Sequence, residues 1–318
     1  QHFTEARSVS NDVRAWRGLA SVFRRQGRYR EAESILEEAF ATLGPDETPP
    51  LWLEQAWTLA VEGRPEETME AARSGLARAP ADDPLRPYLL MQLAQAEKIQ
   101  GLAESALHHS LDAQQLFEQS HDQRGLTTAL RLTAGIHLDL DDFEAAVAAL
   151  RDGLELAERV GNVEELAGCL INLGMVEHQR GNLDEAIDCD RRAIAEFERI
   201  GHGAGRAIGY ANLSEKLMDR GDLDEALQSS ENAFEIAREI EHTPTMADAL
   251  QTMAAIYMKR GEFLTAADRA EQAVEINLGV GATRYAAEAS EVAAQAWNMA
   301  GMRARADEAR ARARALGL

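Results

Sequence analysis

A glycine that returns every 40 residues constrains the fold of this chain more than any other feature of its sequence. The column contains Gly181, Gly221, Gly261 and Gly301, and it continues backwards through Asp141, Gly101, Gly63 and Gly27. A second turn column lies midway between these positions and contains Gly161, Gly201 and Gly281, with Glu241 as the exception. A fixed period of this length indicates supersecondary repeats that stack on their neighbours, and not one large globular core.

The residues around each glycine predict two helices per repeat. After the glycine, the copies RGNLDEAIDCDRRAI, RGDLDEALQSSENAF and RGEFLTAADRAEQAV contain an acidic residue early and then Ala and Leu spaced three or four apart. This is the pattern of a helix start followed by an amphipathic helix. Before Gly181, apolar residues from Leu166 to Val176 recur at the same spacing, and no segment alternates long enough to indicate a strand.

We therefore predict an all-α fold of about eight helix-turn-helix repeats, forming a single array over residues 1–318. The predicted repeats are approximately 12–44, 50–79, 83–119, 123–160, 163–200, 203–241, 243–281 and 282–317. Each repeat has a small residue on both helices, such as Gly174 and Ala186 in the fifth, and two such residues let the helix backbones approach closely.

The same positions make the chain resemble the tetratricopeptide repeat (TPR) family. The first repeat matches that family's pattern at Trp16, Leu19, Ala20, Phe23, Gly27, Ala32, Leu36 and Ala39. The 40-residue length resembles the variety found in kinesin light chains, Pins/LGN-type adaptors and bacterial Rap-type regulators. The resemblance implies a TPR-like solenoid that forms a curved right-handed superhelix, with the first helix of each repeat lining a concave groove.

Carrying the family pattern over, position by position, predicts a peptide-binding groove. Its predicted residues are Trp57, Met91, Gln95, Arg131, Asn172, Met175, His178, Asn212, Glu215, Met218, Gln251, Met258 and Lys259. Asn172 and Asn212 share one column, and an amide side chain both donates to and accepts from a peptide backbone. The methionines suit an adaptable binding surface, although methionine serves equally well to fill gaps between packed helices.

The net charge of −21 argues against nucleic acid as a direct partner, because binding to phosphates needs clustered Lys and Arg. The two ends differ from this average. Residues 1–30 contain seven Arg against two acidic residues, and residues 301–318 contain five Arg against two. We interpret these arginines as solvated helix faces, and self-association of a basic end with the acidic middle is the alternative.

No apolar run reaches the length of a transmembrane helix and no signal-peptide pattern is present, so we expect no membrane partner and a cytoplasmic location. Cys169 and Cys189 are too few for a disulfide framework. The start at Gln1 and the helix-like residues 1–10 lead us to expect a piece excised from a longer protein.

Motifs for catalysis and for cofactor binding are absent from the sequence. There is no GxxxxGK[ST], GxSxG, HExxH or CxxC, and the glycine-rich stretch at Gly201 joins two predicted helices. His202 and His242 share a column, but equivalent atoms of stacked helices lie about 8–10 Å apart, too far for one zinc ion. We therefore predict no catalytic residues, no metal, no other cofactor and no enzyme activity.

The sequence thus favours a protein- or peptide-binding scaffold that uses the groove of a TPR-like array. The alternative is a ligand-sensing segment of a larger bacterial signalling or transcription regulator, whose output domain is not in this chain. The parent reading frame would separate the two hypotheses.

Overall fold

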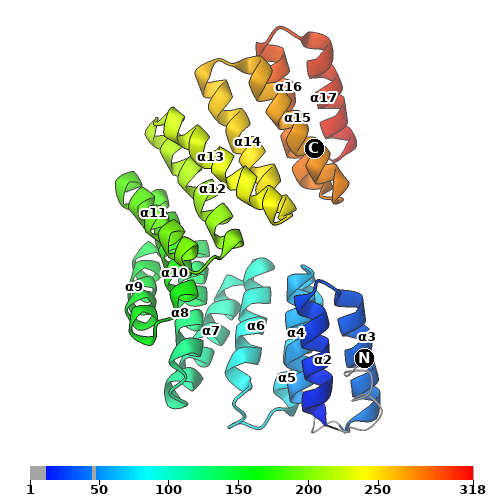
Figure 1. The fold of residues 1–318 in the computed structure, drawn as a ribbon. Coiled ribbons are helices and arrows are strands. Elements are labelled where there is room, and N and C mark those ends of the chain that lie inside the picture. The colour runs from blue at the N-terminus through cyan, green and yellow to red at the C-terminus, as the bar shows by residue number, and fades with distance from the viewer. Residues whose placement is uncertain (1–11, 45–47, 318) are drawn as a thin grey trace. The chain divides into compact units, whose positions relative to one another are not determined.

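The structure, a computed structural model, describes residues 12–44 and 48–317. In that part of the chain it contains sixteen α-helices, α2 to α17, and no strand, which confirms the predicted all-α fold (Figure 1). Consecutive helices pair as antiparallel hairpins, so the described helices form eight repeats of a TPR-like solenoid. Residues 1–10, for which an additional helix tail was expected, lie outside the described ranges.

The chain divides into two compact units, Gln1–Val160 and Gly161–Leu318, and each contains four hairpins. Unit 1 contains α2 (Val13–Arg25), α3 (Tyr29–Thr42), α4 (Pro49–Val61), α5 (Pro65–Arg78), α6 (Arg86–Ile99), α7 (Ala103–Gln119), α8 (Gln123–Asp139) and α9 (Phe143–Val160). Unit 2 contains α10 (Val163–Gln179), α11 (Leu183–Arg199), α12 (Gly203–Arg220), α13 (Leu223–Glu239), α14 (Thr243–Arg260), α15 (Phe263–Gly279), α16 (Thr283–Met299) and α17 (Arg303–Ala315). The single array over residues 1–318, with the repeat bounds given above, stays a prediction.

The turn columns correspond to residues in the left-handed backbone region. Gly181 has a φ of 83°, and the two interruptions of the glycine columns keep this geometry, with φ of 57° at Asp141 and 56° at Glu241. That conformation costs a non-glycine residue about 1–2 kcal/mol. The packing of the helices on either side of the turn therefore imposes a geometry that Asp141 and Glu241 disfavour locally.

Close approach of the two helices in a hairpin is visible at Gly174 of α10. A Cβ atom at this position would lie 2.8 Å from Oδ1 of Asp190 and 3.1 Å from the carbonyl oxygen of Ala186, both on α11. Only glycine fits there without a shift of the neighbouring helix. Alanines make the same kind of contact elsewhere, and Ala20, Ala32, Ala254 and Ala266 are fully buried.

The histidines that share a sequence column are helix caps. His202 precedes α12, and its Nδ1 accepts a hydrogen bond from the backbone N–H of Gly205 at 2.9 Å. His242 precedes α14, and its Nδ1 lies 2.9 Å from Oγ1 of Thr245. The contact of His202 satisfies a backbone N–H of the first helical turn, which would otherwise lack a partner, whereas His242 contacts only a side chain.

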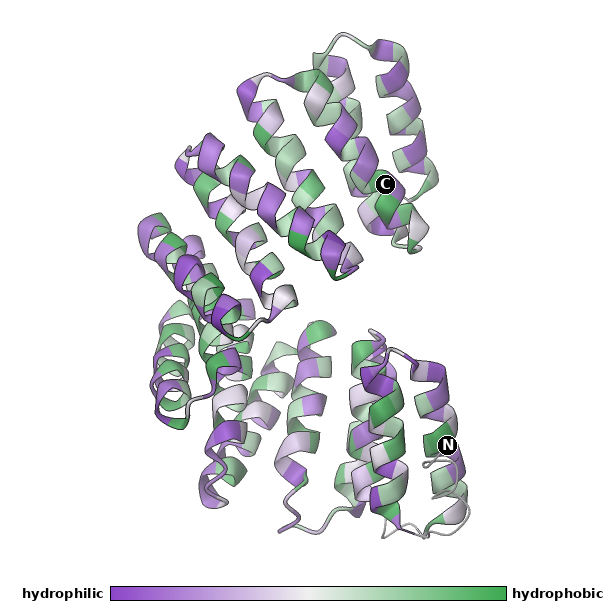
Figure 2. Cartoon of the chain, in the orientation of Figure 1, coloured by the Kyte–Doolittle hydropathy of each residue, from purple (hydrophilic) through white to green (hydrophobic). Residues whose placement is uncertain are grey.

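Hydropathy varies within every helix, because each helix presents one face to its neighbours (Figure 2). No helix in the described ranges is long and apolar enough to span a membrane. The last helix, α17, is hydrophilic over most of its surface and buries only alanines, namely Ala306, Ala309 and Ala313.

Candidate functional site

The first helix of each hairpin carries the predicted groove. Counted back from the turn residue, the predicted positions lie 10, 9, 6 and 3 residues before it, and we call these positions the groove columns. All predicted groove residues except Lys259 fall in these columns, on α4, α6, α8, α10, α12 and α14. In the first repeat, whose turn residue is Gly27, the columns contain Arg17, Gly18, Ser21 and Arg24 of α2.

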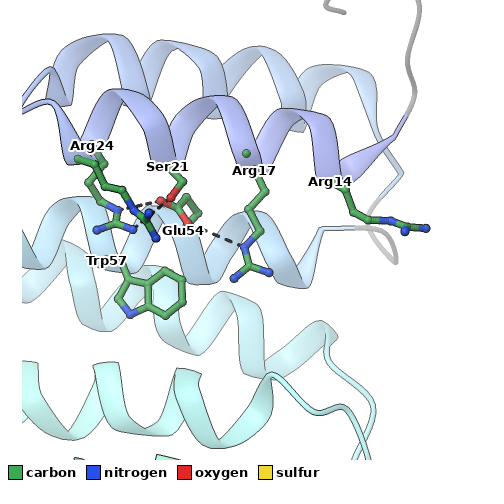
Figure 3. Close-up of a pocket in the computed structure, with 8 residues that line it drawn as sticks. Arg14, Arg17, Ser21, Arg24, Glu54 and Trp57 are labelled. Atoms are coloured by element: carbon green, nitrogen blue, oxygen red, sulfur yellow. Dashed lines mark hydrogen bonds and ion pairs between the residues drawn. The ribbon is translucent and has the colours of Figure 1, made fainter. Parts of the chain in front are cut away.

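In unit 1 the groove columns of the first two repeats enclose a pocket of about 540 Å³ between α2 and α4 (Figure 3). It is lined by Arg14, Arg17, Gly18, Ser21, Arg24, Arg25, Glu54 and Trp57. Trp57 is the predicted groove residue of the second repeat. The pocket therefore extends the predicted groove by one repeat, onto residues that the sequence interpretation assigned to a solvated face.

Glu54 holds two of the pocket's arginines in place. Its side chain is only 1% exposed, and Oε1 accepts a hydrogen bond from Nε of Arg24 at 2.8 Å. Nε of Arg17 lies 3.9 Å from Oε2 of the same carboxylate, so Glu54 lies between the two guanidinium groups (Figure 3). Arg24 also donates to Oγ of Ser21 at 3.5 Å. A buried carboxylate needs such partners, because desolvation penalises an unpaired charge.

Trp57 lies beneath the same two arginines. The guanidinium carbon of Arg17 is 5.6 Å from the ring centroid and that of Arg24 is 5.5 Å, both within the range of a cation–π contact. The ring is half-buried and packs against the cluster that includes Leu53 of α4 and Leu89 of α6. The indole is therefore fixed by the core on one side and open to the pocket on the other.

The other predicted residues of unit 1 have unequal access to solvent. Gln95 is exposed and Arg131 is half-buried, as a groove position requires. Met91 is only 8% exposed and packs with Ala94 and Phe117 in the core formed by α6, α7 and α8. The position of Met91 is therefore corrected from groove surface to core, because its side chain fills space between helices.

In unit 2 the predicted groove residues form a mixed polar and methionine surface on α10, α12 and α14. Its half-buried members are Asn172, His178, Asn212, Met218, Gln251 and Met258, and its exposed members are Met175, Glu215 and Lys259. Met175 is 40% exposed, so its side chain is available to a partner.

Charged groups connect neighbouring repeats on this surface. Nε2 of His178 lies 2.8 Å from Oδ2 of Asp219, and Nζ of Lys259 lies 3.9 Å from Oδ1 of the same carboxylate. Lys259 also donates to the carbonyl oxygen of Met218 at 3.2 Å. Partial desolvation raises the pKa of Glu215, although Lys216 and His178 oppose the rise. Glu215 therefore supplies the surface with a carboxylate that a cation would stabilise.

Beneath this surface is a buried ion pair that the sequence interpretation missed. Nζ of Lys216 on α12 donates to Oδ2 of Asp190 on α11 at 2.5 Å, and the two side chains are 2% and 0% exposed. Neither residue belongs to a groove column, so the pair links two helices and is not accessible to a partner. Its sequence signal is a charged residue at an otherwise apolar helix position, which single-sequence reasoning assigns to the surface by default.

The arginines of the pocket had a clearer signal. Applying the groove columns to the first repeat selects Arg17 and Arg24 directly, because the counting from Gly27 is the same as in later repeats. When these arginines are counted only in the net charge of residues 1–30, their positions relative to Gly27 are not considered. Metal chemistry gains no support, since no group of three or more His, Cys, Asp or Glu in the described ranges could hold an ion.

The fold and the groove columns define a helical-repeat protein built from antiparallel hairpins. Three segments match family models described as tetratricopeptide repeat, over residues 15–50, 166–200 and 206–278. The chain belongs to the tetratricopeptide repeat family. No curated protein sequence matches the chain.

Solved structures support the same fold. A signal-transduction ATPase with a TPR sensor from Pyrococcus horikoshii superposes with a TM-score of 0.71 at 16% identity, covering 98% of this chain and 48% of its own length. A Rap protein complexed with competence and sporulation factor gives a TM-score of 0.71 at 13% identity, covering 98% of this chain and 89% of that one. Kinesin light chain repeats from Podosopora anserina give 0.51 at 17% identity, covering 59% and 93%. This chain thus spans about half the length of the Pyrococcus protein.

Proposed function

We propose that this chain is a protein- or peptide-binding scaffold and that its first helices hold an extended segment of the partner. The observation that carries the proposal is the surface of unit 2, where amides and partly exposed methionines lie in matching columns of neighbouring repeats. Similarity to a Rap protein that was crystallised with a signalling factor supports the same class of function. The proposal includes no catalysis and no cofactor, and it places the protein in the cytoplasm.

The spacing of the groove columns fits a peptide backbone. Asn172 and Asn212 occupy the same column of consecutive repeats, and equivalent positions on packed helices are about 10 Å apart. An extended peptide advances about 3.3 Å per residue, so about three residues pass each repeat. We expect the two amides to contact the backbone at roughly every third residue of the partner.

The side chains around these amides specify the partner's chemistry. Met175, Met218 and Met258 are partly exposed and polarizable, so they accept apolar side chains of varied shape. Glu215 favours a Lys or Arg of the partner, because its carboxylate is partly desolvated. The preferred segment is therefore extended and apolar, with one basic residue near the second repeat of unit 2.

The test is a titration of a partner captured from cell extract and identified by mass spectrometry. The double variant Asn172→Ala/Asn212→Ala removes hydrogen bonds worth roughly 0.5–1.5 kcal/mol each. Binding should weaken by about one to two powers of ten, since each 1.4 kcal/mol is tenfold. Asn232→Ala on the second helix α13 is the matched control. Equal affinities for wild type, control and folded double variant would show that the partner uses another face.

A second candidate function is ligand sensing within a larger regulator. It is favoured by the similarity to a TPR sensor in a protein of about twice this length. In that case ligand binding to the groove would change the hairpin packing and thereby control an output domain. The complete reading frame tests this candidate, and a frame that encodes no further domain would contradict it.

A further inference from the structure

The pocket between α2 and α4 has a charge opposite to that of the chain. Four arginines line it against the single carboxylate of Glu54, whereas the whole protein has a net charge of −21. Positive charge gathered in a concave site attracts anions more strongly than the same charge spread over a surface. The pocket can attract an anion only if Glu54 leaves part of the positive charge of these arginines unneutralised.

Glu54 neutralises only part of the pocket. Its contacts are made by Nε of Arg24 at 2.8 Å and by Nε of Arg17 at 3.9 Å. Each guanidinium has five N–H donors, and Glu54 approaches Arg17 only at its Nε atom. Arg14 and Arg25 add two further charges at the rim, where Arg14 extends away from the others (Figure 3).

Burial of Glu54 turns this cluster into a preorganised site. The carboxylate is 1% exposed, and it fixes Arg24, which is itself only 18% exposed. Trp57 supplies a rigid aromatic wall under both guanidinium groups. Arginines that are already oriented lose less conformational entropy when an anion binds, so the site is more than a loose basic face.

The dimensions of the site select the ligand. Both guanidinium carbons lie near one ring centroid, so Arg17 and Arg24 are no more than about 11 Å apart. Residues two apart in an extended peptide point to the same side and are separated by about 6.6 Å, which lies within this limit. The volume of about 540 Å³ has room for a few side chains.

We propose that this pocket binds an extended peptide segment with two anionic side chains two residues apart, one at Arg17 and one at Arg24, on the side of the segment that faces Trp57. The anionic groups are carboxylates or phosphates, which share the geometry that guanidinium recognises. This inference rests on the proposed peptide-binding function and adds a second recognition element, in unit 1, with the opposite charge preference to Glu215 in unit 2.

Short synthetic peptides test the proposal directly. We would measure fluorescence anisotropy of labelled acetyl-Gly-Ser-Glu-Leu-Glu-Ser-Gly-amide with the full chain. Blocked ends leave only the side chains charged. The same peptide with both Glu replaced by Gln, and with both replaced by phosphoserine, separates neutral, carboxylate and phosphate forms. We expect the Gln peptide to bind at least tenfold more weakly than the better anionic peptide, and that peptide to lose affinity as salt rises.

Variants separate the pocket from general charge attraction. Arg17→Gln should weaken binding about tenfold or more, whereas Arg30→Gln, an exposed arginine on α3 with the same charge change, should not. Arg24→Gln is combined with Glu54→Gln, so that no buried carboxylate is left unpaired, and this pair should also lose binding. Melting curves establish that each variant is folded.

The possible outcomes are distinct. Preference for one anionic peptide, lost in Arg17→Gln and kept in Arg30→Gln, supports the proposal and identifies carboxylate or phosphate as the preferred group. Equal losses in both variants, binding of neither anionic peptide, or stronger competition by a single-stranded oligonucleotide would overturn it. The Asn172→Ala/Asn212→Ala variant should bind the acidic peptide normally, so failure of the pocket and failure of the unit 2 groove can be told apart.

Discussion

Replacement of Lys216 by methionine should destabilise unit 2 far more than an ordinary surface change. Lys216 and Asp190 are 2% and 0% exposed, and their Nζ and Oδ2 atoms are 2.5 Å apart. Removing one member of a buried ion pair leaves an uncompensated charge, at a cost of about 3–5 kcal/mol in the free energy of unfolding. Methionine has a similar length, so the loss reports mainly on the charge of Asp190 and not on a cavity.

The deficit should depend on pH in a defined direction. Burial raises the pKa of Asp190 above its ordinary value, and Lys216 opposes the rise. For a carboxyl whose pKa is raised in the folded state, stability is lost as pH rises through the folded pKa, because the unfolded chain ionises more readily. Lys216→Met removes the main opposing group and therefore raises that pKa further. The variant should lose most stability near pH 8 and recover much of it near about pH 5, where Asp190 takes up a proton.

Urea denaturation followed by far-UV circular dichroism measures the effect. The control is Asp190→Asn/Lys216→Met, which removes both charges and should return to within about 1–2 kcal/mol of the wild type at either pH. Comparison of the four proteins as a double-mutant cycle isolates the pair. A Lys216→Met variant as stable as the wild type near pH 8, or one equally weakened at both pH values, would refute the reasoning.

Further predictions concern glycines, thiols and polyanions. Gly174→Ala should destabilise by about 1–3 kcal/mol through contact with α11, whereas Gly18→Ala, whose Cβ meets no atom within 4 Å, should stabilise α2 by up to about 1 kcal/mol in thermal melts. Glu241→Gly should raise stability by about 1 kcal/mol because it relieves a φ of 56°, and an unchanged melting curve would contradict this. Burial raises the pKa of the Cys189 thiol to about 11, so a thiol reagent at neutral pH should modify it slowly until the protein is unfolded in guanidinium. The net charge of −21 predicts no useful affinity for duplex DNA, and a clear electrophoretic shift at about 150 mM salt would show that the basic pocket dominates.

The predicted site shows where sequence reasoning was sufficient and where it was not. The distance in sequence from the turn residue was enough to predict that Trp57 and Met175 lie on the first helices with access to solvent. The reason is that equivalent positions of stacked repeats face the same way. Register alone also placed Met91 there, yet that side chain is buried among α6, α7 and α8. A groove column identifies the face of a helix on which a residue lies. It does not give the size of the neighbouring side chains, and their size determines how deeply the residue is buried.

The sequence by itself determined the repeat. Glycine at the turn, small residues at the helix contact and apolar spacing within each helix are local properties, and in a stack each repeat needs only its nearest neighbours. The 40-residue period, the approximate bounds of the helices and the family therefore follow from the amino-acid sequence. Even Glu241 was placed correctly in the turn column, since its φ of 56° matches that of the glycines in the column.

Tertiary structure decided the chemistry. The contacts of Glu54 with Arg24, and of Asp190 with Lys216, join residues 30 and 26 positions apart on neighbouring helices. Sequence periodicity does not contain such distances, because they depend on how far one helix is rotated and shifted against the next. Charges that look like solvated surface in the sequence are in one case a buried pair and in the other the frame of a basic pocket. The physical reason is that burial of a charge is tolerated only where a partner meets it, and here the partner comes from another helix.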